Sequence, residues 1–478
     1  MVHGRVRLTG HDDSAPSGPL DEAFAVIREE AGVPGEFPPD VLAAAAASAR
    51  EPALPAHDLT DLPFFTIDPA GATDLDQAMH LEADGDGFRV RYAIADVPAF
   101  VPPAGPVDAE ARRRGQTIYS PDRRTPLHPT VISEDAGSLL PGQVRPAFVW
   151  DLRLDAEGEL TSSDVTTALV RSRDRLDYEG VQAAVERGDD PRLDLLRRIG
   201  ERRLALEADR GGASLPMPEQ EVVDTGDGYR LRLRPPVPAE DWNAQVSLLT
   251  GTAAAGMMLA GEVGVLRTMP APAAHELARF HRQAAALGVR WPAEMAYGDF
   301  LRTLDRTDGR HLALIHEATR LFRGAGYTPF DGAVPEVVEH AAVAAPYAHV
   351  TAPLRRLVDR FGLVICASLC ADVEVPAWVR EALPLLPAAM TASDRVAGTV
   401  ERACTDAVEV AVLRSRVGEV FDAVVVAVPE KGDDGEVQLL DPPVLARAKG
   451  ARQLGASVRL RLTAADVVTR SLELVPVG

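Results

Sequence analysis

The hydrophobic pattern changes its period along this chain of 478 residues, and that change constrains the fold more than any other feature. FRVRYAIADV and AFVWDLRLD alternate apolar and polar residues, as half-buried strands do. Longer segments with helical spacing follow, VSLLTGTAAAGMMLAGEVG and PLRRLVDRFGLVICASLCADV. Strands that come first and helices that come later predict one large α+β domain.

The two ends of the chain have patterns of their own. Residues 418–476 hold GEVFDAVVVAV, GEVQLLDPP, SVRLRLTAAD and SLELV between turn residues, which predicts a small β-barrel of the OB type. Near the start, LDEAFAVIREEAG and PPDVLAAAAASARE predict helices that lead into the proline-marked linker EPALPAHDL. We therefore expect a helical arm and linker over 1–56, one large domain over 57–390, and a helix with an OB-like barrel over 391–478.

The charge balance limits the possible partners. A net charge of −21 means that the whole molecule repels polyanions, so a nucleic acid needs a local basic funnel. No apolar stretch approaches the roughly 18 residues of a membrane span, and MVHGRVRLTGHDD has no secretory signal. We expect a cytoplasmic protein without membrane association or an obligate protein partner, hence a monomer. Cys366 and Cys370 lie in an apolar helical run without a His or Cys partner nearby, and we expect them to be buried side chains.

The segment FTIDPAGATDLDQAM places three aspartates within nine positions, Asp68, Asp74 and Asp76, directly after an apolar run. The β-branched and aromatic residues 64–67 predict a buried strand that ends at Asp68. Carboxylates that converge at a strand end repel one another unless a counter-charge intervenes, and Mg²⁺ is a suitable counter-ion because it prefers oxygen ligands. An acidic surface turn with capping aspartates is the alternative, and the spacing alone leaves both open.

With YAIADVPAFV, this segment resembles the signature of the RNB family, the catalytic domain of ribonuclease II and its relatives. Three further blocks are similar to family motifs and come in the same order: ARRRGQTIYSPDRRTPLHPTVISEDAGSLLPGQVRPAFVWDLRLDAEGEL, SRDRLDYEGVQ and YAHVTAPLRRLVDRF. The resemblance covers about residues 63–370, with a weaker continuation into the predicted C-terminal barrel. It implies an α+β fold in which a large mixed RNB-type catalytic domain precedes a small OB-like barrel.

The resemblance implies a metal-dependent hydrolytic 3′→5′ exoribonuclease that degrades single-stranded RNA to 5′-mononucleotides, with Mg²⁺ or Mn²⁺ as cofactor. The usual pair of N-terminal cold-shock barrels of the family has no counterpart, because about 56 residues cannot hold two such barrels. The alternative is a catalytically impaired RNB-fold protein that still binds RNA. A third hypothesis is a metal-dependent phosphohydrolase of small nucleotides.

Carried over by position, the resemblance makes Asp68, Asp74, Asp76 and Gln77 the metal site, with Asp74 and Asp76 also catalytic. The family has a fourth aspartate where this chain has Gln77, whose amide removes a charge from the site but can lend one oxygen to Mg²⁺. We expect Gln77→Asp not to reduce activity. Arg355 corresponds to the arginine beside the scissile phosphate, where a guanidinium can stabilise developing negative charge.

The remaining candidates would contact RNA. Arg356 follows Arg355, but adjacent residues of a helix point about 100° apart, so an ion pair between Arg356 and Asp359 is its alternative role. Tyr119 and Tyr178 match family tyrosines that can stack on bases near the end of the RNA channel. Gln245 stands near a family glutamate linked to ribose recognition. The phosphate funnel would be made by five arginines near Tyr119, with a solvated charge run as the alternative: Arg112, Arg113, Arg114, Arg123 and Arg124.

Overall fold

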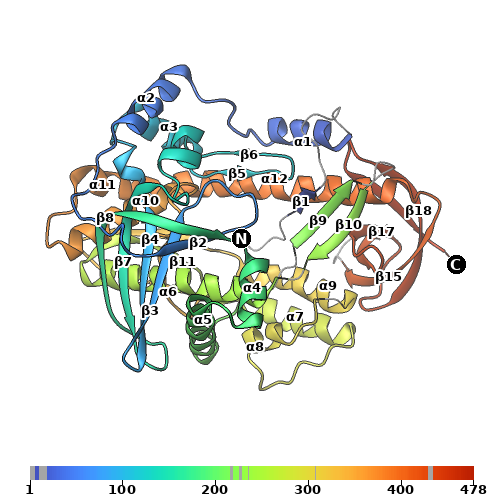
Figure 1. The fold of residues 1–478 in the computed structure, drawn as a ribbon. Helices are drawn as coiled ribbons and strands as arrows, with labels where there is room; N and C mark the ends of the chain where they lie inside the picture. The colour runs from blue at the N-terminus through green and yellow to red at the C-terminus, as the bar shows by residue number, and fades with distance from the viewer. Residues whose placement is uncertain are drawn as a thin grey trace.

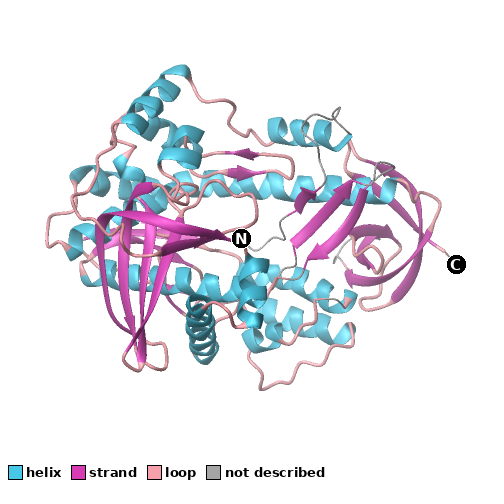
Figure 2. Cartoon of the chain, in the orientation of Figure 1, coloured by secondary structure: helices cyan, strands magenta, loops and turns pink. Residues whose placement is uncertain are grey.

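The computed structural model describes residues 6–9, 19–215, 219–224, 229–234, 236–306, 308–428 and 434–477. Figure 1 shows two β-rich ends joined by layers of helices, with the long helix α12 (Leu386–Arg414) extending from one end to the other. Figure 2 shows that the strands gather into these two groups while helices fill the space between them. In the part of the chain that is described, no helix combines the length and the apolar character needed to cross a membrane.

The first β-rich end is a closed barrel with the strand order β2-β3-β4-β7-β8. Its strands are β2 (Phe64–Ile67), β3 (Gln77–Asp84), β4 (Gly87–Ala95), β7 (Val144–Leu154) and β8 (Leu160–Leu176). The alternating segments of the sequence form β4 and β7, which pair antiparallel from Phe88–Leu154 to Ala95–Ala147. The short strand β2 closes the barrel by pairing parallel with β8.

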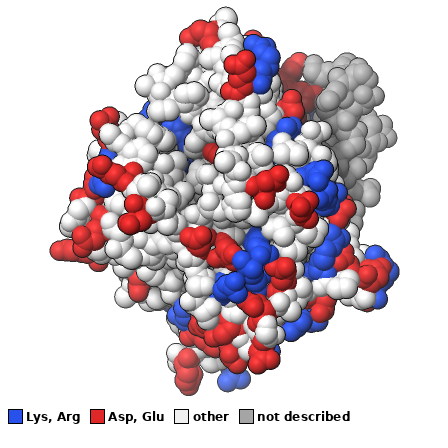
Figure 3. All heavy atoms as spheres, turned by 60° about the vertical axis from the view of Figure 1, so that its left-hand side comes forward, with Lys and Arg blue, Asp and Glu red and all other residues white. Residues whose placement is uncertain are grey.

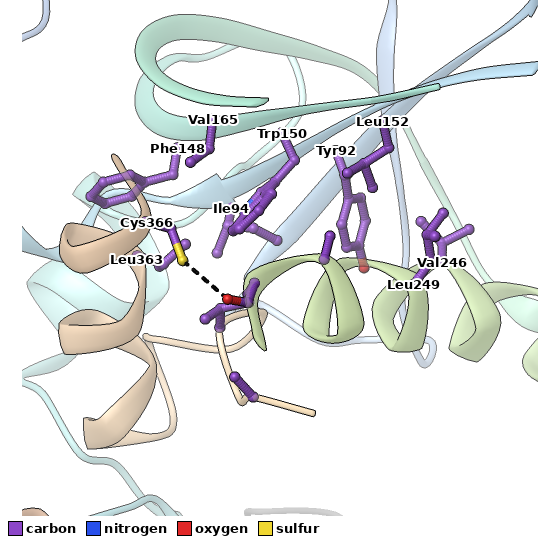
Figure 4. Close-up of a cluster of buried hydrophobic side chains, with 14 of the residues drawn as sticks. Tyr92, Ile94, Phe148, Trp150, Leu152, Val165, Val246, Leu249, Leu363 and Cys366 are labelled. Atoms are coloured by element: carbon purple, nitrogen blue, oxygen red, sulfur yellow. Dashed lines mark hydrogen bonds between the residues drawn. The ribbon is translucent and has the colours of Figure 1, made fainter. Parts of the chain in front are cut away.

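Helices α6 (Pro238–Ala260) and α10 (Leu357–Cys370) pack against this barrel and form the main core with it. In Figure 4, Tyr92 points from its strand toward α6, where Val246 and Leu249 lie beside it, while Trp150 and Ile94 lie between Tyr92 and Cys366 of α10. Cys366 is buried and its thiol contacts the Ala254 carbonyl, as expected for a packed side chain. Apolar residues that occur at helical spacing in the sequence therefore cover one side of the barrel.

Two further groups of elements complete this part of the molecule. Between β4 and β7 lie η1 (Val97–Ala99), α3 (Pro106–Arg114), β5 (Ile118–Tyr119), β6 (Arg124–Thr125) and the π-helical turn η2 (Ile132–Ala136). After β8 come α4 (Tyr178–Arg187), α5 (Pro191–Asp209), β11 (Val263–Thr268), β12 (Gly326–Asp331), β13 (Glu339–His340), β14 (Ala345–Pro346), α11 (Ala377–Ala382) and η4 (Leu383–Leu385).

The second β-rich end is a closed five-stranded barrel in the order β15-β16-β17-β19-β18, which confirms the predicted OB-like barrel. Its strands are β15 (Val420–Ala427), β16 (Asp434–Leu439), β17 (Leu445–Lys449), β18 (Ser457–Asp466) and β19 (Ser471–Pro476). Val424 and Val426 of β15 pack on a helical group in front of the barrel: α7 (Ala274–Ala286), α8 (Tyr297–Arg302), α9 (Gly309–Ala318) and η3 (Thr319–Phe322).

The N-terminal segment contains the two expected helices, α1 (Pro19–Glu30) and α2 (Pro39–Arg50), but α1 is not an isolated arm. Its buried residues Leu20, Phe24 and Ile27 pack on α12. A strand that we did not predict, β1 (Val6–Thr9), pairs parallel with β9 (Glu219–Asp224), which pairs with β10 (Tyr229–Arg234). The partner of β1 lies about two hundred residues away, so local sequence did not reveal it.

Candidate functional site

One cavity of about 1070 Å³ collects side chains from both ends of the RNB-like region. The connection from β2 to β3 forms one wall, the β5–β6 hairpin and its flanks a second, α6 a third, and α12 a fourth. Its polar and aromatic lining includes Asp68, Asp74, Asp76, Gln77, Tyr119, Arg123, Arg124, Tyr178, Glu240, Asn243, Ser247, Arg267, Tyr327, Tyr347, His349, Arg355, Arg356, Asp394 and Glu401. The segment of three aspartates therefore opens into the same space as the predicted arginines and tyrosines.

Backbone and side-chain contacts fix the segment between β2 and β3. The Asp68 amide donates to the Leu176 carbonyl at 3.1 Å, which extends the β2–β8 pairing by one residue. The Leu75 amide donates to Ser138 Oγ at 2.9 Å, and the Leu75 side chain is fully buried. The Ala95 amide donates to the Asp76 carbonyl at 2.9 Å. Leu75 faces the core, while Asp74 and Asp76 on either side of it line the cavity.

Burial and mutual repulsion keep two of the three carboxyl groups weakly acidic. Burial, and then the charge of Asp74, raises the pKa of Asp68 to about 7. Burial also raises the pKa of Asp76 well above its usual range, although Arg355 and the Leu354 amide act in the opposite direction. The Leu354 amide donates to Asp76 Oδ1 at 2.7 Å. Both carboxyl groups would ionise more readily beside an added positive charge.

Asp74 already has a positive partner. Arg124 Nη1 donates to Asp74 Oδ1 at 2.5 Å, and Arg124 Nε donates to Glu134 Oε1 at 3.0 Å. Arg124 therefore holds the acidic segment, and in this arrangement it does not supply an uncompensated charge to a phosphate.

The fit of these residues to a divalent cation is partial. Among the described residues, no three His, Cys, Asp or Glu side chains form a group that could hold a metal ion. However, Asp68 Oδ2 is buried and has no hydrogen-bond partner, and a buried carboxylate oxygen normally has one. Carboxylate oxygens are the ligands that Mg²⁺ and Mn²⁺ prefer. As they are placed, Asp68, Asp74 and Asp76 do not form a metal site; they could hold such an ion only if their carboxylates moved together and Asp74 exchanged its contact with Arg124.

Gln77 makes a protein contact that the sequence did not predict. It is the first residue of β3, and its Nε2 donates to the carbonyl oxygen of Thr351, in the segment that leads to Arg355. The amide is therefore engaged as a donor to the backbone.

Arg355 and Arg356 both line the cavity, contrary to our argument from helix geometry. They precede α10, and Arg356 is the residue that caps the helix, with an extended backbone at φ −133°. Arg355 Nε lies 3.5 Å from Asp76 Oδ2, whereas Arg356 donates to both carboxylate oxygens of Asp359 at 2.8 and 2.7 Å. The alternative role proposed for Arg356, an ion pair with Asp359, is the one observed, although the pair is buried and not on the surface.

The two predicted tyrosines lie on different elements of the same cavity. Tyr119 belongs to β5 and Tyr178 is the first residue of α4, where Asp177 caps the helix by accepting from the Gly180 amide at 2.7 Å. The exposed Arg123 lies beside Tyr119 in the cavity wall.

On the face shown in Figure 3, arginines lie among carboxylates and form no continuous basic surface, so any attraction of phosphates there must be local.

Gln245 is not where its predicted role requires. Its side chain is only 3% exposed, is absent from the cavity lining, and donates to Glu207 of α5. The face of α6 that meets the cavity carries Glu240, Asn243 and Ser247 instead. Gln245 lies on the buried face of α6, and Glu240 is the glutamate of this helix that lines the cavity.

Three of the five arginines proposed for a phosphate funnel are structural. Arg112 donates to Asp108, and Arg113 and Arg114 donate to Glu110, one helical turn earlier on α3. These ion pairs hold the three guanidinium groups against α3. Of the five, only Arg123 and Arg124 line the cavity.

The cavity wall also contains a cluster of aromatic residues and an arginine that we did not predict from the sequence. Tyr327 Oη and His349 Nδ1 are 2.8 Å apart, and the Arg267 guanidinium lies 4.5 Å from the centre of the Tyr327 ring. Arg267 Nη1 also lies 3.7 Å from Asp394 of α12. Burial lowers the pKa of His349 well below its usual value, with Arg356 and Arg267 adding to the effect. These residues are spread over more than a hundred positions, so no local spacing signalled them.

Comparison with family models decides the classification. The model of the RNB domain matches residues 56–363. The chain belongs to the RNB family. A second model, the RNase II-type exonuclease C-terminal S1 domain, matches residues 419–477, the OB-like barrel.

The RNB match is supported by relatives with known names. The chain is 31% identical over 329 residues to exosome complex exonuclease RRP44 homolog A of Arabidopsis thaliana, covering 64% of this chain and 34% of that protein. It is 30% identical over 322 residues to ribonuclease R of Escherichia coli, covering 63% and 39%. It is also 40% identical over 136 residues to an Arabidopsis relative named inactive exonuclease DIS3L2, covering 28% and 13%. The chain thus matches less than half of the length of each relative.

Solved RNB structures have the same fold. Mycoplasma genitalium RNase R in complex with ribose-methylated single-stranded RNA superposes with a TM-score of 0.83 at 18% identity, covering 96% of this chain and 78% of that one. Yeast Ssd1, described as a pseudonuclease, superposes with a TM-score of 0.69 at 16% identity, covering 97% and 58%. The predicted fold, an α+β RNB domain followed by an OB-like barrel, is confirmed.

Proposed function

We propose that this RNB protein is a metal-dependent hydrolytic exoribonuclease that shortens single-stranded RNA from the 3′ end and releases 5′-mononucleotides. Its exoribonuclease relatives support a role in RNA degradation. One observation carries the proposal for this chain: Asp68, Asp74, Asp76, Arg355, Tyr119 and Tyr178 come from four separate parts of the sequence and line one cavity. Such a cavity offers carboxylates, a guanidinium and aromatic rings to one polymer end.

Asp68, Asp74 and Asp76 would hold Mg²⁺ or Mn²⁺, which when bound activates water and polarises the phosphate. The unpartnered Oδ2 of Asp68 and the raised pKa values of Asp68 and Asp76 support this assignment. Because Asp76 accepts the Leu354 amide through Oδ1, its Oδ2 is the oxygen that faces Arg355.

Arg355 would stabilise the negative charge that develops on the scissile phosphate, since a planar guanidinium matches phosphate oxygens. Its side chain is 37% exposed, so a substrate can reach it. Until a phosphate binds, Asp76 would hold the Arg355 guanidinium in position. Arg356 would act indirectly, because its Nε and Nη2 groups both donate to the Asp359 carboxylate.

Tyr119 and Tyr178 would stack on the last bases of the RNA, a contact that tolerates any sequence. Glu240 and Asn243 of α6 line the same wall and offer polar groups for the ribose 2′-hydroxyl, which distinguishes RNA from DNA. The exposed Arg123 would contact the backbone of the incoming strand.

We propose the same division of the chain as from sequence: the N-terminal helices and linker over 1–56, the RNB-like catalytic domain over 57–390, and a helix with the OB-like barrel over 391–478.

A second candidate function is RNA binding without hydrolysis. The contact between Asp74 and Arg124 and the amide at position 77 favour it, because both lower the negative charge available to a metal. Family membership allows either outcome, since the relatives include proteins named as inactive and as a pseudonuclease.

A digest of single-stranded RNA with Mg²⁺ or Mn²⁺, labelled at the 3′ or the 5′ end in parallel, tests the proposal. An exonuclease acting from the 3′ end releases a 3′ label first as mononucleotide, while a 5′ label moves through a ladder of shorter products. RNA that is shifted in a gel but never shortened supports the binding protein. Turnover of free nucleotides with no effect on RNA would support the third hypothesis, a small-molecule phosphohydrolase.

A further inference from the structure

The segment that carries Arg355 has little regular structure between Tyr347 and α10. Its conformation therefore depends on contacts with other elements. The Leu354 amide donates to Asp76 Oδ1 at 2.7 Å, and the Leu354 carbonyl lies 3.1 Å from His128 Nδ1. The Arg355 carbonyl accepts from the Thr117 amide at 3.0 Å. Each backbone group named here has a partner outside the segment, which fixes the start of the Arg355 side chain.

One of these contacts comes from Gln77. Thr351 is only 5% exposed, and its carbonyl oxygen accepts from Gln77 Nε2. Gln77 directly follows Asp76 at the start of β3. Asp76 and Gln77, adjacent residues where β3 begins, thus hold the arginine segment at two points, the Leu354 amide and the Thr351 carbonyl.

The chemistry of this contact requires a donor. A carbonyl oxygen only accepts hydrogen bonds, an amide side chain can donate, and an ionised carboxylate cannot. The aspartate that the family resemblance predicts at this position would place a carboxylate oxygen where the structure has an N–H group. Its side chain would also be one methylene shorter. The neighbouring contact has the opposite polarity, because Asp76 accepts from an amide.

We propose that Gln77 is a positioning residue that fastens the Arg355 segment to the start of β3. The kinetic part of this inference rests on the proposed function, in which Arg355 acts at the scissile phosphate. It reverses our expectation from sequence: Gln77→Asp lowers activity in this chain, although it restores the residue of the family motif.

The substitutions Gln77→Met, Gln77→Glu and Gln77→Asp separate donation from shape and charge. Methionine keeps the length of the side chain without a donor, and we expect it to lower kcat by about ten- to a hundredfold with little change in KM, because the reacting groups lose alignment. Aspartate should lower kcat at least as much.

The split between kcat and KM provides the readout that a merely structural role would not produce. Gln77→Glu keeps an extended polar side chain, but an ionised carboxylate cannot donate to the Thr351 carbonyl. It should therefore lower kcat as Gln77→Met does, with little change in KM.

Amide hydrogen exchange in the intact protein tests the contact without RNA. Gln77→Met should speed exchange of a peptide that spans 351–356, with no change in a control peptide from β7. If the parent does not shorten RNA, the proposed function fails and the exchange experiment alone decides the contact. Unchanged exchange in Gln77→Met, or full activity of Gln77→Asp, would overturn the proposal.

Discussion

Arg355 Nε lies 3.5 Å from Asp76 Oδ2, although 278 residues separate the two positions. The Leu354 amide holds the other oxygen of Asp76, so the carboxylate is buried between a backbone donor and a guanidinium. This relationship joins the acidic segment and the arginine segment into one site.

Replacing Asp76 by asparagine should abolish hydrolysis and leave RNA binding intact. Asparagine has nearly the same shape, so the Leu354 contact can persist, but it lacks the charge that a cation and Arg355 require. We expect a loss of at least about a hundredfold in kcat, comparable with the removal of one transition-state contact. Single-turnover digestion and a gel-shift assay measure the two properties. Asp84→Asn, at the exposed far end of β3, is the matched control and should behave like the parent.

The adjacent arginines should respond differently to alanine. Arg355→Ala should lower kcat by about 10²–10³ and cost less stability than Arg356→Ala, because the Arg355 side chain is partly exposed and Asp76 keeps the Leu354 amide as a donor. Arg356→Ala should lower the free energy of unfolding by about 3–5 kcal/mol, because it leaves the buried charge of Asp359 without its partner. Urea unfolding and initial rates distinguish the two. If the two variants changed kcat and the free energy of unfolding equally, the catalytic role of Arg355 and the structural role of Arg356 would be contradicted.

The raised pKa of Asp68 predicts how Asp68→Asn affects stability at different pH values. A carboxyl group with a pKa near 3.8 when unfolded and about 7 when folded destabilises the folded state as the pH rises through this interval. The parent should therefore lose stability relative to Asp68→Asn between about pH 4 and pH 7, by up to about 4 kcal/mol. Denaturant unfolding in the presence of a chelator measures the difference. A constant difference in stability across this interval would show that folding does not raise the pKa of Asp68.

Added Mg²⁺ or Mn²⁺ should stabilise the parent protein and not the Asp68→Asn variant. A ligand that binds only the folded state at about a hundred times its Kd contributes about 2.7 kcal/mol. Thermal unfolding with increasing metal, compared with the same series in a chelator, measures the shift in Tm. Equal shifts in both proteins would mean that Asp68 does not hold the ion.

Phe24→Ala should show that α1 is part of the folded body. Phe24 is fully buried against α12, so its truncation should cost about 3–5 kcal/mol. Arg28 of the same helix donates to both oxygens of Asp122 in the cavity wall, at 2.6 and 2.8 Å. Limited proteolysis should therefore cut near residue 34 faster in the variant. Val26→Ala, at an exposed position of α1, is the control.

Much of the fold was present in local patterns. The alternation in FRVRYAIADV and AFVWDLRLD set strands whose apolar faces must be covered, and the helical spacing after residue 238 supplied the cover. The strand β1 was not predictable, because four residues have no distinctive pattern and the pairing with β9 is remote. Position along α6 was also not predictable, because a shift of one or two residues exchanges its buried and cavity faces, and this placed Gln245 wrongly.

Residue type and short spacing alone determined the strands β2, β4 and β7, the OB-like C-terminal barrel, and the cluster of Asp68, Asp74 and Asp76. Arg355 was identified by the resemblance to the RNB family. Only the tertiary structure decided which charges are already paired. Arg124 with Asp74, Arg356 with Asp359, and Gln77 with the Thr351 carbonyl are contacts across 50 positions, 3 positions and 274 positions. Charge and hydrogen bonding act through space over a few ångströms, so the available groups of a site are known only when its neighbours are placed.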